Sequence, residues 1–142
     1  MPLEDCLTED PIQVMFSGGC VEMRDLFGFL QTAEADFSVA LTEYKHRDFS
    51  MVDVVRAGCS KGSALGAWSR RRGFAPADVM AMGDNLNDLQ MLEFVGTPVL
   101  MGNALAEMKT RGWPVTATND EAGVARAIEQ YILNPSKGVI AR

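Results

Sequence analysis

The sequence predicts an α/β protein in which a parallel sheet follows a smaller α/β unit. From residue 58 onward, short apolar stretches of strand length alternate with amphipathic stretches of helix length, which is the pattern of a parallel sheet with right-handed crossovers. Before residue 58 the order is strand, helix, strand, strand, which indicates a separate unit. The 142 residues suffice for one domain, or for one domain and part of another.

The N-terminal unit has four predicted elements. Residues 12–16 form a short apolar stretch that ends at a Ser-Gly-Gly sequence, which predicts a strand and a turn. Residues 21–32 carry apolar side chains three or four positions apart, which predicts an amphipathic helix. Residues 37–41 and 51–55 predict two further strands, and the polar stretch 42–48 is expected at or between their ends.

The C-terminal unit begins with a predicted helix over residues 61–72. Leu65 and Trp68 are expected on its buried face, and Gly73 suits its end. Residues 79–82 are continuously apolar, as expected for a strand that is buried on both faces. The elements predicted beyond it are strands at 98–101 and 115–118, helices at 87–95 and 104–111, a last helix from Asn119 or Asp120 to about 133, and a flexible tail at 135–142.

Composition and charge exclude several classes of protein. A hydrophobic fraction of 47% and a charged fraction of 23% are those of a soluble globular protein. The formal net charge of -6 argues against nucleic acid or an anionic membrane as a partner, and no apolar run approaches the ~20 residues that cross a bilayer. Cys6, Cys20 and Cys59 show no paired metal-ligand spacing, and an odd number of cysteines without a signal peptide predicts a cytoplasmic protein.

Two carboxylates follow the predicted strand 79–82. Asp84 comes directly after Gly83, and Asp88 falls in the first turn of the next predicted helix. Ligands of open parallel sheets bind beyond the carboxyl ends of the strands, where both carboxylates are expected. Neighbouring carboxylates repel each other unless a cation lies between them, and Mg²⁺ commonly takes one or two of them together with phosphate oxygens and water. The spacing alone leaves open the alternative that both residues are turn and helix-cap residues.

Four stretches of the chain, in this order, resemble the haloacid dehalogenase superfamily in its Cof-type branch, subfamily IIB. They are GCSKGSAL at residues 58–65, GDNLND at 83–88, VLMGNA at 99–104 and TNDEAGVA at 118–125. The resemblance is close over residues 51–132. Residues 12–50 resemble more loosely the end of the family's α/β cap.

The resemblance implies a Rossmann-like parallel sheet, of which this chain holds the C-terminal part. Residues 1–57 would be the remnant of the cap domain and residues 58–134 the C-terminal part of the core. It further implies a Mg²⁺-dependent phosphatase that hydrolyses small phosphorylated metabolites, sugar phosphates above all, through a phospho-aspartate. No residue indicates which metabolite.

The resemblance also assigns roles to individual residues. Asp84 would bind Mg²⁺, and Asp88 would support the metal directly or through water, with Asn87 beside it. Lys61 would meet the phosphate, where an ammonium offsets charge in the transition state. Taken alone, Lys61 would be interpreted as an exposed lysine on a helix, and its place in the matching stretch reverses that interpretation. Asn103, after the next predicted strand, is expected to face the same cleft.

The family's attacking aspartate has no counterpart in this sequence. It belongs to an Asp-x-Asp pair, and the 142 residues contain none. Ser17 imitates the family's second motif, but its distance from Lys61 places it in the cap, where a turn role is expected. We therefore expect the chain to be inactive alone.

Two other functions remain open. The chain could be a non-catalytic domain that binds a partner or self-associates through the sheet edge that an absent first strand would leave unpaired. It could also be the phosphorylation domain of a P-type cation pump, which has a motif similar to residues 83–88. The lack of a membrane span and the cap-like residues before Gly58 argue against the pump.

Overall fold

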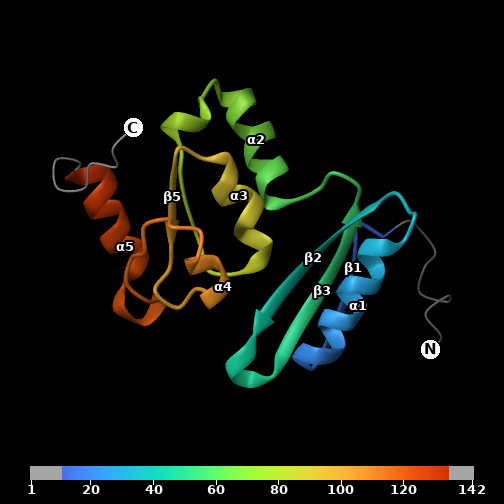
Figure 1. The fold of residues 1–142 in the computed structure, drawn as a ribbon. Coiled ribbons are helices and arrows are strands. Elements are labelled where there is room, and N and C mark those ends of the chain that lie inside the picture. Colours follow the sequence, from blue (N-terminus) through green and yellow to red (C-terminus); the bar gives the residue numbers. More distant parts are fainter. Residues whose placement is uncertain (1–10, 135–142) are drawn as a thin grey trace. The chain divides into compact units, whose positions relative to one another are not determined.

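The computed structural model describes residues 11–134, which divide into two compact units between Ser60 and Lys61 (Figure 1). The predicted tail at 135–142 and Cys6 lie outside the described residues. Within the described part, no helix has both the length and the apolar character that crossing a membrane requires.

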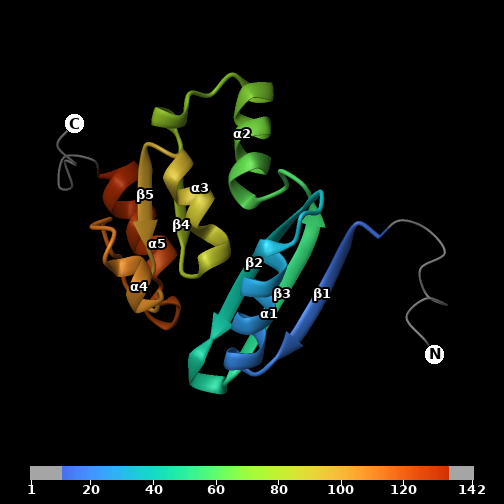
Figure 2. The same ribbon diagram turned by 45° about the vertical axis from the view of Figure 1, so that its right-hand side comes forward.

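The N-terminal unit is a three-stranded antiparallel sheet with one helix lying against it (Figure 2). The strand order is β1-β3-β2, so the last strand of the unit is the central one and pairs with both neighbours. The elements are β1 (Gln13–Gly18), α1 (Cys20–Thr32), β2 (Phe37–Tyr44), the short 3₁₀ segment η2 (Lys45–Arg47) and β3 (Phe49–Arg56).

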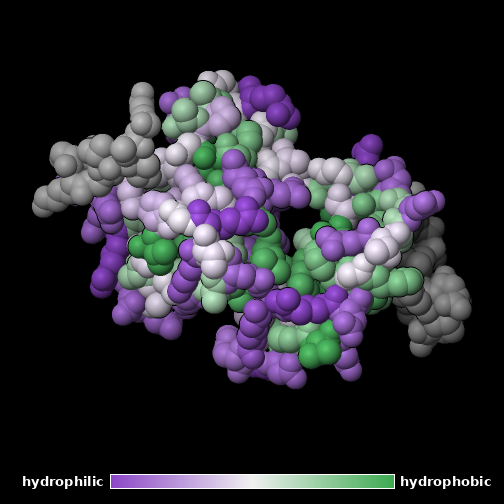
Figure 3. Space-filling model, in the orientation of Figure 1, coloured by the Kyte–Doolittle hydropathy of each residue, from purple (hydrophilic) through white to green (hydrophobic). Residues whose placement is uncertain are grey.

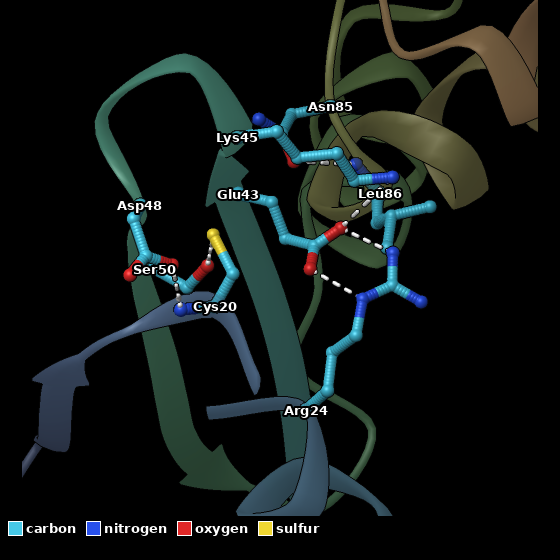
Figure 4. A network of polar contacts seen from close by, with 8 residues as sticks. All are labelled: Cys20, Arg24, Glu43, Lys45, Asp48, Ser50, Asn85 and Leu86. Carbon is cyan, nitrogen blue, oxygen red and sulfur yellow. Dashed lines mark hydrogen bonds and ion pairs between the residues drawn. The ribbon is translucent and has the colours of Figure 1, made fainter. Parts of the chain in front are cut away.

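A buried polar network joins α1 to this sheet (Figure 4). Glu43 of β2 is 2% exposed, and its carboxylate accepts hydrogen bonds of 2.5 Å from Nε and from Nη2 of Arg24. The Lys45 ammonium lies 3.7 Å from the same carboxylate. One helical turn before Arg24, the Cys20 thiol accepts a hydrogen bond of 3.2 Å from the hydroxyl of Ser50.

Two predictions for this unit are wrong. Ser17 does not turn the chain, because it lies within β1 opposite Met51. Thr42 and Glu43, predicted to lie at the end of a strand or beyond it, extend β2 and are 6% and 2% exposed. The polar sequence does not predict a buried strand here, because Glu43 can be buried only with its charge balanced. Arg24, which balances it, lies 19 positions away in the chain.

The C-terminal unit is a small parallel sheet between helices. Its elements are α2 (Lys61–Arg72), η3 (Pro76–Asp78), β4 (Met80–Gly83), η4 (Leu86–Asp88), α3 (Leu89–Phe94), β5 (Thr97–Leu100), α4 (Ala106–Lys109), η5 (Asn119–Glu121), α5 (Gly123–Ile128) and the π-helical η6 (Glu129–Leu133). β4 and β5 pair in parallel, and Leu100 adds a parallel bridge to Val115. In Figure 1, α2 and α3 lie on one side of this sheet and α5 on the other. The predicted α/β fold class with a parallel sheet is confirmed.

The core of this unit is apolar, and its helices approach closely at glycines. The buried core residues are Ala81, Leu92, Val95, Leu100, Ala104 and Met108. A Cβ atom at Gly62 would lie 2.6 Å from the carbonyl oxygen of Gln90, and one at Gly66 would lie 3.3 Å from the ring of Phe94. The start of α2 therefore rests directly on α3.

The buried face of α2 differs from the prediction. Gly62, Gly66 and Ser69 are its buried residues, whereas Leu65 is only partly buried. Trp68 is 49% exposed and packs against the ring of Phe74. The apolar spacing of a helix does not show which face a neighbouring helix can approach, and here the small residues decide it.

Two predicted elements are shorter in the structure. The helix predicted at 104–111 is reduced to α4, and the strand predicted at 115–118 is reduced to the single bridge at Val115.

The last predicted helix is interrupted. Thr118, rather than Asn119 or Asp120, caps η5 together with Glu121. Ala122 then adopts a left-handed conformation, with φ of 58°, and separates η5 from α5.

Candidate functional site

The loop after β4 folds back so that Asp84 and Asp88 lie at the carboxyl end of that strand. Gly83 permits this return, because a Cβ atom there would lie 2.5 Å from the Cβ of Asp88 and 2.8 Å from its Oδ2. Such distances are far below van der Waals contact, so the loop requires glycine at this position.

The carboxylate of Asp88 uses both of its oxygens within the unit. Oδ2 accepts hydrogen bonds from the backbone N–H groups of Asp84, at 2.9 Å, and of Asn85, at 3.2 Å. Oδ1 accepts a hydrogen bond from the ammonium of Lys61. Asp88 is only 5% exposed. This carboxylate therefore closes the loop and holds the lysine at the same time.

Lys61 is the first residue of α2, and its side chain is 50% exposed. Its ammonium carries three N–H donors, of which Asp88 accepts one. The close approach of Gly62 to α3 brings the start of α2 to the loop after β4. The structure thus joins Lys61 to Asp88, 27 positions apart in the sequence.

Asp84 is half-buried and is tied to the loop that follows β5. Its Oδ2 accepts a hydrogen bond of 2.8 Å from Nδ2 of Asn103. Its carbonyl oxygen accepts one of 3.1 Å from the backbone N–H of Leu105. Within residues 11–134, Oδ1 of Asp84 accepts no hydrogen bond. Asp84 therefore presents one carboxylate oxygen beside the Asp88–Lys61 pair.

Asn103 has a second partner that the sequence did not reveal. Its Oδ1 accepts a hydrogen bond of 3.0 Å from the backbone N–H of Asn119, a residue for which the sequence predicts only a helix-cap role. The one signal in the sequence was that Asn103 and Asn119 fall in two of the four stretches that carry the family resemblance.

The turn that carries Asn119 is itself fixed by a capping box. The carboxylate of Glu121 accepts hydrogen bonds from the hydroxyl of Thr118, at 2.9 Å, and from its backbone N–H, at 3.2 Å. The Thr118 hydroxyl, and after it the Thr118 N–H, lower the pKa of Glu121 below its usual 4.5.

Asn87 takes a different position from these residues. It is half-buried in η4, directly before Asp88 in the chain. The neighbouring Asn85 caps η4, and its Oδ1 accepts a hydrogen bond of 3.0 Å from the N–H of Leu86 (Figure 4).

The donor set of this site fits a magnesium ion in part. Mg²⁺ prefers oxygen ligands and commonly binds through one or two protein carboxylates, with water and phosphate oxygens in the remaining positions. Asp84 offers such an oxygen. Among the described residues, no three or more His, Cys, Asp or Glu side chains are grouped to hold a metal ion, so Asp84 would supply only part of the coordination shell.

Comparisons with known proteins match most of the chain. A family model described as haloacid dehalogenase-like hydrolase matches residues 4–128. A Haemophilus influenzae protein is 34% identical over 129 residues, which are 91% of this chain and 47% of that protein. The pyridoxal phosphate phosphatase YbhA of Escherichia coli is 40% identical over 82 residues, which are 58% of this chain and 30% of that protein.

Solved structures show the same fold. A haloacid dehalogenase-like hydrolase from B. subtilis has a TM-score of 0.75 and 27% identity, over 92% of this chain and 45% of that one. A subclass IIB sugar phosphatase of the superfamily has a TM-score of 0.71 and 24% identity, over 90% of this chain and 46% of that one. The chain therefore spans less than half the length of the proteins it resembles.

Proposed function

Because the chain belongs to the haloacid dehalogenase-like hydrolases, we propose that it is the metal- and phosphate-binding part of a Mg²⁺-dependent phosphatase. The proposed substrates are small phosphorylated metabolites, with sugar phosphates first among them. The names of two similar proteins support this class, since one is a pyridoxal phosphate phosphatase and the other a sugar phosphatase.

The ion pair between Lys61 and Asp88 carries this proposal. A buried carboxylate holds a half-exposed ammonium in one place, at the strand end where ligands of parallel sheets bind. An ammonium fixed in this way attracts a phosphoryl group and offsets the charge that develops on its oxygens during transfer. Since the partner is already in place, the charge requires no rearrangement at the moment of reaction.

Asp84 is the residue that we propose to hold the magnesium ion, through Oδ1. Asp88 would act on the ion through water, because both of its oxygens already accept hydrogen bonds. When bound, Mg²⁺ would neutralise negative charge on the phosphate oxygens. Asn87 and Asn103 are proposed as polar neighbours of the phosphate and the metal.

The attacking carboxylate must come from outside these 142 residues. The sequence contains no Asp-x-Asp pair, so a phospho-aspartate cannot form on the family's motif within this chain. We propose that the chain is inactive alone. A cytoplasmic location belongs to the same proposal, and the free thiols of Cys20 and Cys59 are in keeping with it.

A binding measurement on the chain tests the role of Lys61. Inorganic phosphate with MgCl₂ should shift the backbone amide signals of residues 84–88 in NMR spectra. Lys61→Met should raise the phosphate concentration at half-effect by about tenfold, the loss expected for one charge-assisted contact. Arg71→Met, which removes the same charge from the same helix, is the matched control and should leave the midpoint unchanged. Equal midpoints in both variants would remove Lys61 from the site.

The second candidate is a non-catalytic domain that associates with another chain. Within the described residues β4 pairs only with β5, so its other edge has no strand partner. Apolar surface is also visible on the α5 side of this unit (Figure 3), where Val124, Ile128 and Ile132 are 48%, 37% and 55% exposed. Sedimentation should then show a mass that rises with concentration. A monomer mass at every concentration would contradict self-association.

A further inference from the structure

We propose that Asn103 is a positioning residue that sets the direction of the Asp84 carboxylate, and that the backbone N–H of Asn119 holds Asn103 in place. The orientation of the Asp84 carboxylate is a property of the chain itself. Only the effect of this orientation on metal binding rests on the proposed function. This arrangement gives the turn at residues 118–121, which reaches Asp84 through Asn103, a part in the site.

The contacts form a chain of three links. The Asn119 N–H donates to Oδ1 of Asn103 at 3.0 Å, and Nδ2 of Asn103 donates to Oδ2 of Asp84 at 2.8 Å. One carboxylate oxygen of Asp84 is thereby occupied, and Oδ1 is directed away from Asn103. Without this contact the Asp84 side chain is free to change its χ1 rotamer, and its carboxylate can exchange its two oxygens by rotation about χ2, which is a soft torsion.

The residue type at position 103 follows from the two partners. A backbone N–H can only donate and a carboxylate can only accept, so the side chain between them must accept at one end and donate at the other. An amide does both, and the N–H of Asn119 settles which end faces Asp84. An aspartate at this position would satisfy Asn119 but repel Asp84, and a hydrophobic residue would satisfy neither.

The turn that carries Asn119 is held more firmly than the exposed side chain of Asn103. Thr118 and Glu121 close the turn around Asn119 through their capping box. The carbonyl oxygen of Ala117 accepts a hydrogen bond of 2.9 Å from the N–H of Gly102, directly before Asn103. A Cβ atom at Gly102 would lie 2.7 Å from the backbone nitrogen of Thr118, so the two loops pass in contact. Asn103 is therefore fastened at its backbone and at its amide oxygen.

The test separates the N–H of Asn119 from its side chain. Asn119→Pro removes the N–H at the first residue of η5, where proline is well tolerated, and Thr118 before it has the extended backbone, with φ of -69° and ψ of 167°, that a following proline favours. Asn119→Ala keeps the N–H and removes only the side chain. Asn103→Ala removes both side-chain hydrogen bonds of residue 103. Asn103→Asp keeps the shape of the side chain and the acceptor for Asn119, but it removes the donor to Asp84.

The first readout is the rotamer of Asp84, measured from three-bond couplings of the whole chain without metal. Wild type and Asn119→Ala should show one χ1 rotamer. Asn103→Ala, Asn103→Asp and Asn119→Pro should show averaged couplings. A single unchanged rotamer in Asn103→Ala and Asn103→Asp would overturn the proposal, as would equal averaging in Asn119→Ala and Asn119→Pro.

The second readout is Mn²⁺, used alone as a paramagnetic probe that broadens the amide signals near Asp84. The Mn²⁺ concentration at half-broadening should rise about threefold to tenfold in Asn103→Ala and in Asn119→Pro, and not in Asn119→Ala. Absence of broadening in wild type would contradict the proposed metal site. The couplings of Asp84 would still test whether Asn103 orients its carboxylate. Altered couplings with unchanged Mn²⁺ midpoints would overturn the consequence for the metal.

Discussion

The Lys61 ammonium donates a hydrogen bond to Oδ1 of Asp88, and the other oxygen of that carboxylate closes the loop in which Asp84 lies. One side chain thus determines both the position of the cation on α2 and the shape of the loop after β4. The stability of the loop and the placement of the lysine cannot be changed independently at residue 88.

Asp88→Asn should therefore destabilise the C-terminal unit. If the amide oxygen keeps the bonds from the backbone N–H groups of Asp84 and Asn85, the amide NH2 group faces the Lys61 ammonium, donor against donor, and that bond is lost. We expect a loss of about 1–2 kcal/mol, less than a fully buried charged contact because Lys61 is half-exposed. The measurement is the urea midpoint of unfolding, and Lys61→Met should cost less. An unchanged midpoint in Asp88→Asn would show that the contact contributes nothing to stability.

Gly83→Ala should be the most damaging single methyl addition in the loop. The new Cβ would overlap the side chain of Asp88, and overpacking of this kind costs about 1–3 kcal/mol. Gly28→Ala is the matched control, because a Cβ there meets nothing within 4 Å and lies inside α1. Alanine should stabilise that helix by about 0.5–1 kcal/mol. Amide hydrogen exchange of each unit reports the two effects separately, and equal effects at both glycines would contradict the close approach.

The capping box of η5 should make the turn sensitive to acid. The pKa of Glu121 is lowered in the folded chain, so its contribution is fully present above pH 4.5 and is lost as the pH falls below 4.5 through the folded pKa. The amide signal of Thr118 should titrate with a midpoint below 4.5. Thr118→Val removes the hydroxyl and should move the midpoint toward 4.5, whereas a midpoint at or above 4.5 in wild type would contradict the contact.

The isolated chain should not hydrolyse p-nitrophenyl phosphate in the presence of MgCl₂. The charge proposed to bind phosphate, Lys61, is present, but the sequence has no Asp-x-Asp pair to supply the family's nucleophile. Release of nitrophenol is the measurement, and Asp84→Ala is the control for contamination. Turnover that disappears in Asp84→Ala would refute the proposal that the chain is inactive alone.

The sequence predicted the parts of this structure that depend on local pattern. The helix at 61–72 lies where the spacing placed it, and the apolar stretch 79–82 covers β4 except for its last residue, Gly83. Gly83 and Asp84 were expected at the carboxyl end of that strand, where the structure has them. Each of these features follows from residues within a few positions of one another.

The features that the sequence did not predict depend on partners far along the chain. Glu43 lies in a strand because Arg24 balances its charge, and Trp68 is exposed because Gly62 and Gly66 form the contact with α3. The link from Asn103 to the backbone of Asn119 is of the same kind, since a backbone N–H has no signature in a sequence.

The close approach at Gly83 distinguishes two classes of position in this chain, those that tolerate mutation and those that do not. A side chain at Gly83 or Gly62 would overlap the backbone or side chain of its neighbour, so variation there destabilises the fold. Asn103 is exposed and Asp84 half-buried, so variation there leaves the core intact. Proteins that descend from such a chain can therefore lose the side chains of Asn103 and Asp84 and still fold. The folded domain is then available for another function.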